Sequence, residues 1–322
     1  MNSLYPMLLT PQLKTRPWGG RRLATGFGKD LPDDQPYGES WELYDTCTVA
    51  NGALAGRTIG DLLAEYGAAL AGAGNDVSTG FPLLVKLLDA HQWLSIQDHP
   101  NDEQALALEN EPRGKNEAWY FLRAEPGAKL VLGVKPGATR EALAEAIHEN
   151  RLEALVSFAE VQVDDSVFMA AGTVHALGPG MIIYEIQQSS DTTYRLYDWG
   201  RAGLDGKPRE LHIDKGLQVA NLGAPPEIRN TGDVGGQRVQ IFETPYFITD
   251  RYSLNESDGL TAHLNTHGSF HSLTCIEGAA RVESPSGDVD FSLGQTVLIP
   301  AALGAYTLTT DDAARILLSK QP

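Results

Sequence analysis

Four short segments of this 322-residue chain concentrate side chains that bind metal ions or move protons. They are LSIQDHPND (94–102), GKNEAWY (114–120), AAGTVHALGPG (170–180) and EIQQSSDTTYRLYDWGR (185–201). Two imidazoles, one carboxylate and one amide oxygen suit a borderline divalent ion and leave room for water or substrate. The candidate ligands are Gln97, His99, Glu117 and His175. Each alone could be an ordinary surface or core side chain, but together they indicate a metal site.

The first segment distributes its side chains unusually if it forms a strand. Successive strand residues point to opposite faces, so Ser95, Gln97 and His99 share one face. Asp98 then points the other way, beside Ile96. The strand is either a solvated edge or has one face aimed into a site. In the second case we expect Asp98 to pair with a cationic or hydrogen-bonding neighbour outside the site, and Asp98→Val to preserve metal binding.

Three basic residues lie close to these segments. Lys86 interrupts an apolar run, where an unpaired ammonium is costly, so it either reaches water from an edge strand or points into a polar cavity. Lys115 is expected to share a face with the acid two positions later. Arg195 either serves the site or forms a structural ion pair with Asp191 or Asp198.

The composition limits the class of partner. Acidic residues outnumber basic ones by 42 to 25, and the net charge is −17. This charge repels polyanions, so we expect no nucleic-acid or membrane partner, whereas a small anion in a recessed basic pocket is allowed. Cys47 and Cys275 do not make a disulfide framework, and the chain begins without a basic leader or a long apolar run. These features predict a cytoplasmic protein.

Periodicity predicts a mainly β fold with some helices. Helical spacing of apolar residues occurs at 58–71, 102–111 and 139–158. Strands are expected at 39–45, 82–89, 93–98, 117–122, 129–134, 160–170 and 181–187.

The C-terminal part is predicted to be a second module. From about residue 236 the chain consists of short strands separated by turns, which is typical of a sandwich or barrel. The polar stretch 223–237 reads as a linker, and a weak sequence echo near 168 and 297 indicates a duplicated jelly-roll module. We therefore predict a metal-binding domain with helices at 1–230 and an all-β domain at 231–322.

Six motifs in this order resemble the class I mannose-6-phosphate isomerases, in their short bacterial form. The motifs are RPWGG (16–20), GESWELYD (38–45), PLLVKLLDAHQWLSIQDHPND (82–102) and the last three of the four segments above. The resemblance covers about residues 5–220 and continues more weakly beyond them.

The resemblance implies two cupin-like jelly-roll modules and an isomerase that interconverts mannose 6-phosphate and fructose 6-phosphate. It implies one zinc ion per chain, although other divalent metals are compatible, and a monomer or homodimer. The family's ligands fall on Gln97, His99, Glu117 and His175, and its active-site arginine falls on Arg195. Ser95 and Lys115 match substrate-binding positions, and Lys86 matches a proton-transfer candidate.

Elementary chemistry suggests a role for each basic residue. The pKa of an arginine is too high for a base, so Arg195 would stabilise a developing oxyanion. Lys86 could transfer a proton if desolvation beside a cation depressed its pKa. Lys115 is the first candidate for the phosphate ligand and Arg16 the second.

Two departures and two alternatives accompany the resemblance. Asp98 stands where the family usually has an apolar residue, and the C-terminal module has His267 and His271 without a matching carboxylate, so we expect no metal there. A metal cupin oxygenase and a non-catalytic sugar-phosphate sensor are the alternative functions.

Overall fold

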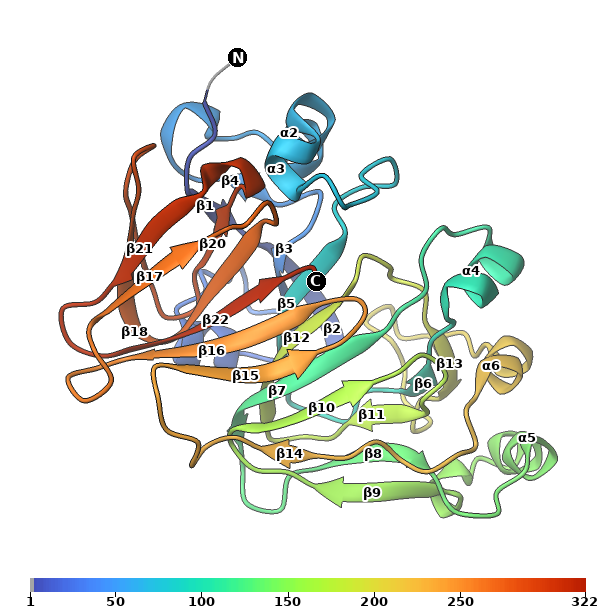
Figure 1. The fold of residues 1–322 in the computed structure, drawn as a ribbon. Helices are drawn as coiled ribbons and strands as arrows, with labels where there is room; N and C mark the ends of the chain where they lie inside the picture. The colour runs from blue at the N-terminus through green and yellow to red at the C-terminus, as the bar shows by residue number, and fades with distance from the viewer. Residues whose placement is uncertain (1–2) are drawn as a thin grey trace.

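The computed structural model describes residues 3–322 and consists mainly of antiparallel sheets. Over these residues the strands form three sheets, of ten, seven and five strands. Figure 1 shows the orange and red C-terminal strands beside the green and yellow strands from the middle of the chain. The prediction of a mainly β fold with some helices is confirmed. Within the same range, the structure contains no helix with the length and hydropathy needed to cross a membrane.

The seven- and five-stranded sheets form the first module. The larger runs in the order β14 (Arg229–Asn230), β10 (Asp165–Met169), β7 (Glu117–Ala124), β12 (Met181–Gln188), β5 (Leu83–Ala90), β3 (Tyr37–Leu43) and β2 (Gln12–Gly20). The smaller runs in the order β13 (Tyr194–Tyr197), β6 (Ile96–Asp98), β11 (His175–Leu177), β8 (Lys129–Val134) and β9 (Val156–Glu160). Apolar side chains from both sheets, including Trp119, Ile183 and Leu130, form one core between them.

The other face of the seven-stranded sheet packs on the C-terminal sheet. Val85, Leu87 and Tyr184 share a core with Leu298 and Leu317 from C-terminal strands. Strands β5 and β12 are therefore buried along their whole length. A strand covered on both faces needs apolar residues on both, which explains the nearly continuous apolar run at 82–89.

The ten-stranded sheet includes strands from both ends of the chain. Its main path runs β15 (Arg238–Glu243), β16 (Ile248–Leu254), β22 (Ala314–Lys320), β18 (His271–Glu283), β20 (Thr296–Ile299), β1 (Met7–Thr10) and β4 (Thr48–Val49). Its other strands are β17 (Thr261–Asn265), β19 (Val289–Ser292) and β21 (Ala305–Thr309). Because Met7 pairs with Leu298, the predicted boundary after residue 230 does not separate the sheets.

The predicted helices are present, with one correction. The helix predicted at 58–71 forms α2 (Ile59–Tyr66) and α3 (Ala68–Ala71), and Asn101 caps α4 (Asp102–Glu109). The helix predicted at 139–158 ends early: α5 (Arg140–His148) stops before Asn150, which adopts a left-handed φ of 56°, and β9 follows. Two further helices are α1 (Arg22–Phe27) and α6 (Ile213–Val219).

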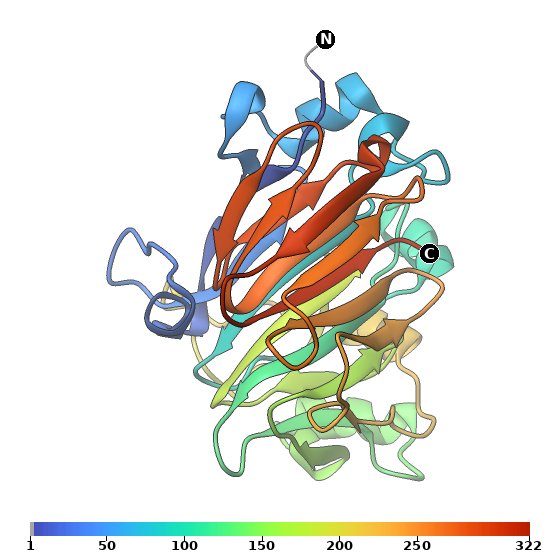
Figure 2. The same cartoon turned by 60° about the vertical axis from the view of Figure 1, so that its left-hand side comes forward.

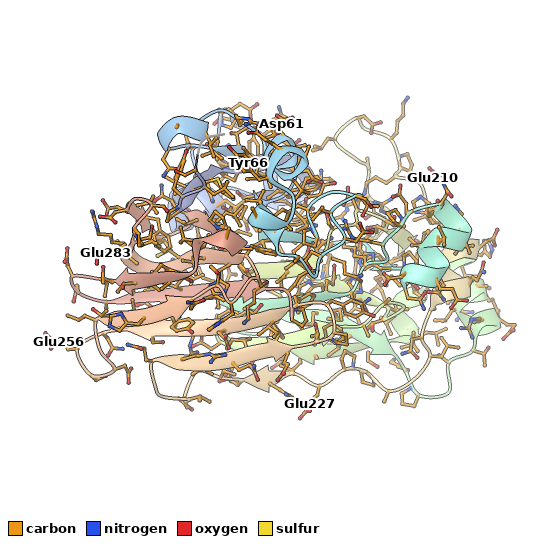
Figure 3. The ribbon with its side chains drawn as sticks, turned by 45° about the horizontal axis from the view of Figure 1, so that its top comes forward. Asp61, Tyr66, Glu210, Glu227, Glu256 and Glu283 are labelled. Atoms are coloured by element: carbon orange, nitrogen blue, oxygen red, sulfur yellow. The ribbon has the colours of Figure 1, made fainter. Side chains whose placement is uncertain are left out.

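The remaining views place the surface features. In Figure 2 the C-terminal strands lie over the green strands, with the light-blue helices at one end. The acidic residues Asp61, Glu227, Glu256 and Glu283, labelled in Figure 3, lie around the outside of the molecule. The predicted strand at 160–170 is interrupted, because Asp164 turns with a φ of 68° between β9 and β10.

Candidate metal centre

Two imidazoles and one carboxylate meet where the two sheets of the first module face each other. Strand β6 ends at Asp98, directly before His99, while β7 begins at Glu117 and β11 begins at His175. His175 also lies opposite Gln97 across the β6–β11 pair. The ligand atoms of His99, Glu117 and His175 all lie within 4.8 Å of one another, and the three residues are buried. The structure thus brings three of the four predicted ligands into one cluster.

Backbone carbonyl groups orient both imidazoles. His99 Nδ1 lies 2.9 Å from the carbonyl oxygen of Thr192, and His175 Nδ1 lies 2.7 Å from that of Thr173. Because a carbonyl oxygen only accepts, each Nδ1 donates its proton and each Nε2 keeps a lone pair. An outer hydrogen bond of this kind is the usual way to fix a metal-binding histidine.

Three inner atoms of the cluster lack hydrogen-bond partners. Across residues 3–322, no group hydrogen-bonds to either carboxylate oxygen of Glu117 or to His175 Nε2. Glu117 Oε1 is 3.3 Å from His175 Nε2, and Oε2 is 3.5 Å from His99 Nε2 and 3.1 Å from Lys115 Nζ. Lys115 supplies a positive charge to Glu117 Oε2 and His99 Nε2 only. Glu117 Oε1 and His175 Nε2 still face each other, buried and without a donor between them, and such lone pairs need a cation. The donor set therefore fits a divalent metal ion.

Protonation states in the cluster also suit metal binding. Burial, helped by the charge of Lys115, lowers the pKa of His99 to about 3, and burial lowers the pKa of His175. Burial alone would raise the pKa of Glu117, but Lys115 and His99 hold it well below its usual value. At neutral pH the cluster therefore offers two neutral imidazoles and a carboxylate, the forms that bind metals.

Gln97 and Ser95 lie beside the cluster, on the face of β6 predicted from the alternation. The hydroxyl of Ser95 donates to Gln97 Oε1 at 3.1 Å, and both residues line the adjoining pocket. The amide oxygen of Gln97 keeps a second lone pair. Its role as a fourth ligand stays a prediction.

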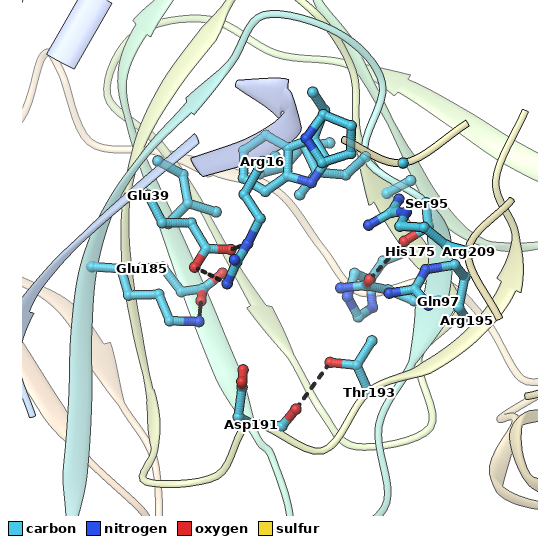
Figure 4. A pocket seen from close by; sticks show the side chains of 18 of the residues that line it. Arg16, Glu39, Ser95, Gln97, His175, Glu185, Asp191, Thr193, Arg195 and Arg209 are labelled. Carbon is cyan, nitrogen blue, oxygen red and sulfur yellow. Dashed lines mark hydrogen bonds and ion pairs between the residues drawn. The ribbon is translucent and has the colours of Figure 1, made fainter. Parts of the chain in front are cut away.

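The cluster opens into a cavity of ≈ 560 Å³. In Figure 4, Arg16, Glu39 and Glu185 lie on one side of the pocket. The other side presents Ser95, Gln97, His175, Arg195 and Arg209. Lys86 and Lys115 also line the cavity. All eight predicted site residues thus lie in the pocket or in the adjoining cluster.

Lys86 points into this pocket from a central strand. Strand β5 lies between β12 and β3, so the edge-strand alternative is wrong. Lys86 Nζ lies 2.9 Å from Glu185 Oε1 and 2.7 Å from Gln187 Oε1. Burial alone would lower the pKa of Lys86, but Glu185 and Glu39 raise it above its usual value. The expected depression of this pKa is therefore wrong, because two carboxylates rather than a cation are its main neighbours.

Glu185 is a site residue that the sequence reasoning missed. Its Oε2 accepts the indole N–H of Trp119 at 2.9 Å, and burial raises its pKa while Lys86 opposes that rise. It lies directly opposite Lys86 in the register of β12 and β5. In the sequence, only its position at the start of the fourth polar segment indicated that Glu185 could belong to the site. Its pairing with Lys86 could be recognised only from the register of the two strands.

The arginine side of the pocket carries excess positive charge. Arg195 Nη1 donates to the carbonyl oxygen of Glu210 at 2.8 Å, and its buried Nε is unpartnered among the described residues. The alternative of an ion pair with Asp198 is wrong, because Asp198 instead binds Arg201 and Arg209. Burial and the nearby charge of Arg209 lower the pKa of Arg195. Arg209, which the sequence reasoning also missed, completes this surface.

Asp98 points away from the pocket, as predicted, but its expected partner is absent. It is fully buried, and neither carboxylate oxygen has a hydrogen-bond partner in the described part of the chain. A Cβ at Gly216 of α6 would lie 3.2 Å from Asp98 Oδ1, so this side chain faces the helix. Burial raises the pKa of Asp98 well above its usual value.

Comparisons with known proteins agree with this geometry. Residues 7–120 match the family model described as phosphomannose isomerase type I, catalytic domain. Mannose-6-phosphate isomerase ManA of Bacillus subtilis is 35% identical over 313 residues, which cover 94% of this chain and 95% of that protein. Mannose-6-phosphate isomerase of Streptococcus mutans is 38% identical over 258 residues, which cover 78% and 80%.

Solved structures share the whole fold. The crystal structure of mannose 6-phosphate isomerase from Bacillus subtilis has a TM-score of 0.88 at 28% identity and covers 99% of this chain and 100% of that one. A structure titled mannose 6-phosphate isomerase (holo; zinc bound) has a TM-score of 0.77 at 17% identity, covers 99% and 100%, and supports the fold. The full-length similarity to curated relatives shows that this chain belongs to the type I phosphomannose isomerase family.

Proposed function

We propose that this protein is a metal-dependent aldose–ketose isomerase that interconverts D-mannose 6-phosphate and D-fructose 6-phosphate. The observation that carries the proposal is the buried pair of Glu117 Oε1 and His175 Nε2, which lack hydrogen-bond partners among the described residues, with His99 beside them at one end of a polar pocket. Two relatives, aligned over 94% and 78% of this chain, carry this activity in their names.

The metal would be held by His99, Glu117 and His175, with Gln97 as a fourth ligand. Zinc is the expected ion, since imidazole and carboxylate ligands suit it, while other divalent ions are compatible with the same donors. When bound, the ion supplies Lewis acidity that lowers the cost of negative charge on the sugar oxygens by several kcal/mol.

The chain's own residues must move a proton between C1 and C2 of the sugar. The carboxylate neighbours of Lys86 keep it an ammonium. We therefore assign Lys86 Nζ the role of proton donor. The Lys86–Glu185 pair, 2.9 Å between Nζ and Oε1, places an acceptor beside that donor. A positioned pair of this kind typically contributes about 10² to 10⁴ in rate. Arg195 would stabilise the oxyanion that develops on the neighbouring oxygen.

The phosphate is assigned to the arginine side of the pocket. Lys86, Lys115 and Arg16 each have a carboxylate partner within 3.1 Å. Lys115, the first candidate in the sequence, lies against Glu117 and His99 and so belongs with the reacting oxygens. On the arginine side, Arg195 forms no ion pair among the described residues, and Asp198 is shared by Arg201 and Arg209, so positive charge is in excess there although Arg209 itself contacts Asp198. Arg209 therefore becomes the leading phosphate ligand, and Ser95 contacts the sugar.

A coupled assay tests the proposal directly. We expect turnover of mannose 6-phosphate that a chelator abolishes and added zinc restores. Glu117→Gln should abolish turnover and zinc retention, whereas Glu160→Gln, an exposed acid on β9, should change neither. Binding without turnover in the zinc-loaded protein would instead indicate a sugar-phosphate sensor, and dependence on oxygen would indicate an oxygenase.

Three broader predictions stay with this proposal. A cytoplasmic location is tested by cell fractionation, and a monomer or homodimer by size-exclusion chromatography with light scattering. The expected small-molecule partner, rather than nucleic acid or membrane, follows from the acidic surface.

A further inference from the structure

The backbone of Arg195 is held by a histidine. Arg195 lies opposite Gln97 in the β13–β6 pair, and its own N–H and carbonyl groups are both bound by His212. The N–H of Arg195 donates to His212 Nδ1 at 3.2 Å, and the N–H of His212 donates to the carbonyl oxygen of Arg195 at 2.7 Å. The Arg195 guanidinium donates to the carbonyl oxygen of Glu210 at 2.8 Å. Residues 209–212, the RELH segment, therefore bind Arg195 at three points.

The opposite end of the RELH segment is also tied to β13. Arg209 donates from Nε and Nη2 to the two oxygens of Asp198, at 2.7 and 2.6 Å. Asp198 directly follows β13, and its side chain is only 7% exposed. Arg195 and Arg209 lie near each other on one side of the pocket (Figure 4). The RELH segment is thus attached to β13 at both ends, with a pocket arginine at each attachment.

We propose that His212 is a positioning residue: its neutral imidazole accepts the Arg195 amide proton and thereby fixes the Arg195 guanidinium in the pocket. Protonation of His212 would set an N–H of the ring against the N–H of Arg195, and this bond could no longer form. The catalytic consequence rests on the proposed isomerase function, but the link between His212 and Arg195 does not.

Burial, helped by the charge of Arg195, favours the neutral form of His212. Strand β13 presents Arg195 and the ring of Tyr194, whose centroid is 6.3 Å from that of His212. The other charged groups that face it are Glu210 of the RELH segment, Lys215 of α6, Glu109 of α4, and Glu111, which shares the same surface depression. Figure 3 shows Glu210 beside α4. Burial and the charge of Arg195 lower the pKa of His212 below its usual 6.5.

This arrangement predicts a pH dependence with a definite sign. Above pH 6.5 His212 is neutral and the attachment is complete. As pH falls through the lowered pKa, the ring gains a proton, the bond to the Arg195 amide is lost, and the activity declines. Replacing the imidazole by an acceptor that cannot titrate should remove this contribution to the acid limb.

The central experiment compares three replacements of His212. The Oδ1 atom of His212→Asn can take the place of Nδ1, whereas His212→Gln extends past that position and His212→Ala offers no acceptor. We expect kcat/KM for mannose 6-phosphate at pH 8 to fall about tenfold in the Ala and Gln variants, the loss typical of one neutral hydrogen bond. We expect the Asn variant to stay within about threefold of wild type at pH 8 and to lose less activity than wild type as the pH is lowered below 6.5. His148→Asn, an exposed histidine on α5, is the matched control.

A second measurement does not depend on activity. The chain has eight histidines, so ¹³C-labelled histidine and ¹⁵N-labelled arginine give a small set of resonances. We expect the His212 ring and the Arg195 amide to titrate with the same midpoint, and the Arg195 shift to vanish in His212→Asn. Different midpoints, or an Ala variant with wild-type kcat/KM, would overturn the proposal. The titration of the wild-type protein tests the link between His212 and Arg195 even if the protein shows no isomerase activity. It also does so if His212→Ala does not fold.

Discussion

Asp98→Val should stabilise this protein without loss of metal. Asp98 lies at the end of β6, directly before His99, and its side chain points away from the pocket toward α6. It is fully buried, and no described group bonds to either carboxylate oxygen. Valine removes both oxygens and is well suited to a strand.

The expected gain follows from the cost of two unpartnered polar atoms. A buried polar atom without a hydrogen bond lowers the free energy of unfolding by about 1 to 3 kcal/mol. The carboxyl group of Asp98 has two such oxygen atoms. Taking the lower value for each, removal should increase the free energy of unfolding by about 2 kcal/mol. For a chain of this length, that corresponds to a rise in melting temperature of about 4 °C.

The gain should also depend on pH, because burial raises the pKa of Asp98 well above its usual 3.8. Below pH 3.8 the carboxyl is protonated in both folded and unfolded chains. As pH rises from 3.8 toward the raised pKa, Asp98 ionises in the unfolded chain while the buried carboxyl in the folded protein stays protonated, so the wild-type protein loses stability until the pH passes the raised pKa. The advantage of Asp98→Val should therefore be larger at pH 8 than at pH 5, and Asp98→Asn should lose this pH dependence but keep unpartnered atoms.

Thermal unfolding followed by circular dichroism, together with zinc content by mass spectrometry, tests the reasoning. A lower melting temperature in Asp98→Val would mean that the carboxyl makes a stabilising contact. Loss of zinc would mean that this side chain faces the cluster and that the alternation along β6 is misassigned.

Three further predictions concern the pocket and the second module. Lys86→Met should slow exchange of the C2 proton with solvent by about 10² to 10⁴, and unchanged exchange would place the proton transfer elsewhere. Arg209→Met should raise the KM for mannose 6-phosphate at least about tenfold, because a charged hydrogen bond to the phosphate is lost. The control Lys207→Met, which removes an exposed cation nearby, should leave KM unchanged. Equal effects of the two substitutions would mean that Arg209 does not bind the phosphate. His271→Asn, which retains an acceptor for Tyr306, should leave one zinc per chain, and a lower content would place a ligand in the C-terminal module.

The metal cluster could be predicted from sequence because its residues stand at strand ends within recognisable motifs. Alternation alone placed His99 on one face of β6 and Asp98 on the other, and the structure agrees. The partner of Lys86 could not be predicted, because it depends on the register that sets Glu185 opposite it. The charge state of Lys86 follows from that pairing and was predicted with the wrong sign for the same reason.

Three other failures have a common physical origin in tertiary packing. The apolar positions near 156–158 fit a helix as well as a strand, and only the pairing of β9 with β8 decides between them. We predicted a partner for Asp98 from the general rule that buried charges are paired. In the structure, neither of its carboxylate oxygens has a hydrogen-bond partner among the described residues. Arg209 was missed because its loop carries no periodic pattern, and only the contacts of Asp198 bring it to the pocket.

The pairing of β1 with β20 affects how the protein forms during synthesis. Met7 leaves the ribosome about 290 residues before its partner Leu298, which corresponds to a delay of about 15 to 60 s at ordinary translation rates. Until the C-terminal strands are made, β1 lacks its partner β20, and the face of the seven-stranded sheet that carries Val85 and Leu87 lacks Leu298 and Leu317, which cover it in the folded protein. Contacts so distant in sequence are slow to close. The metal-binding half is therefore synthesised before the strands that cover its sheet, so burial of that apolar face depends on the last part of the chain to be made.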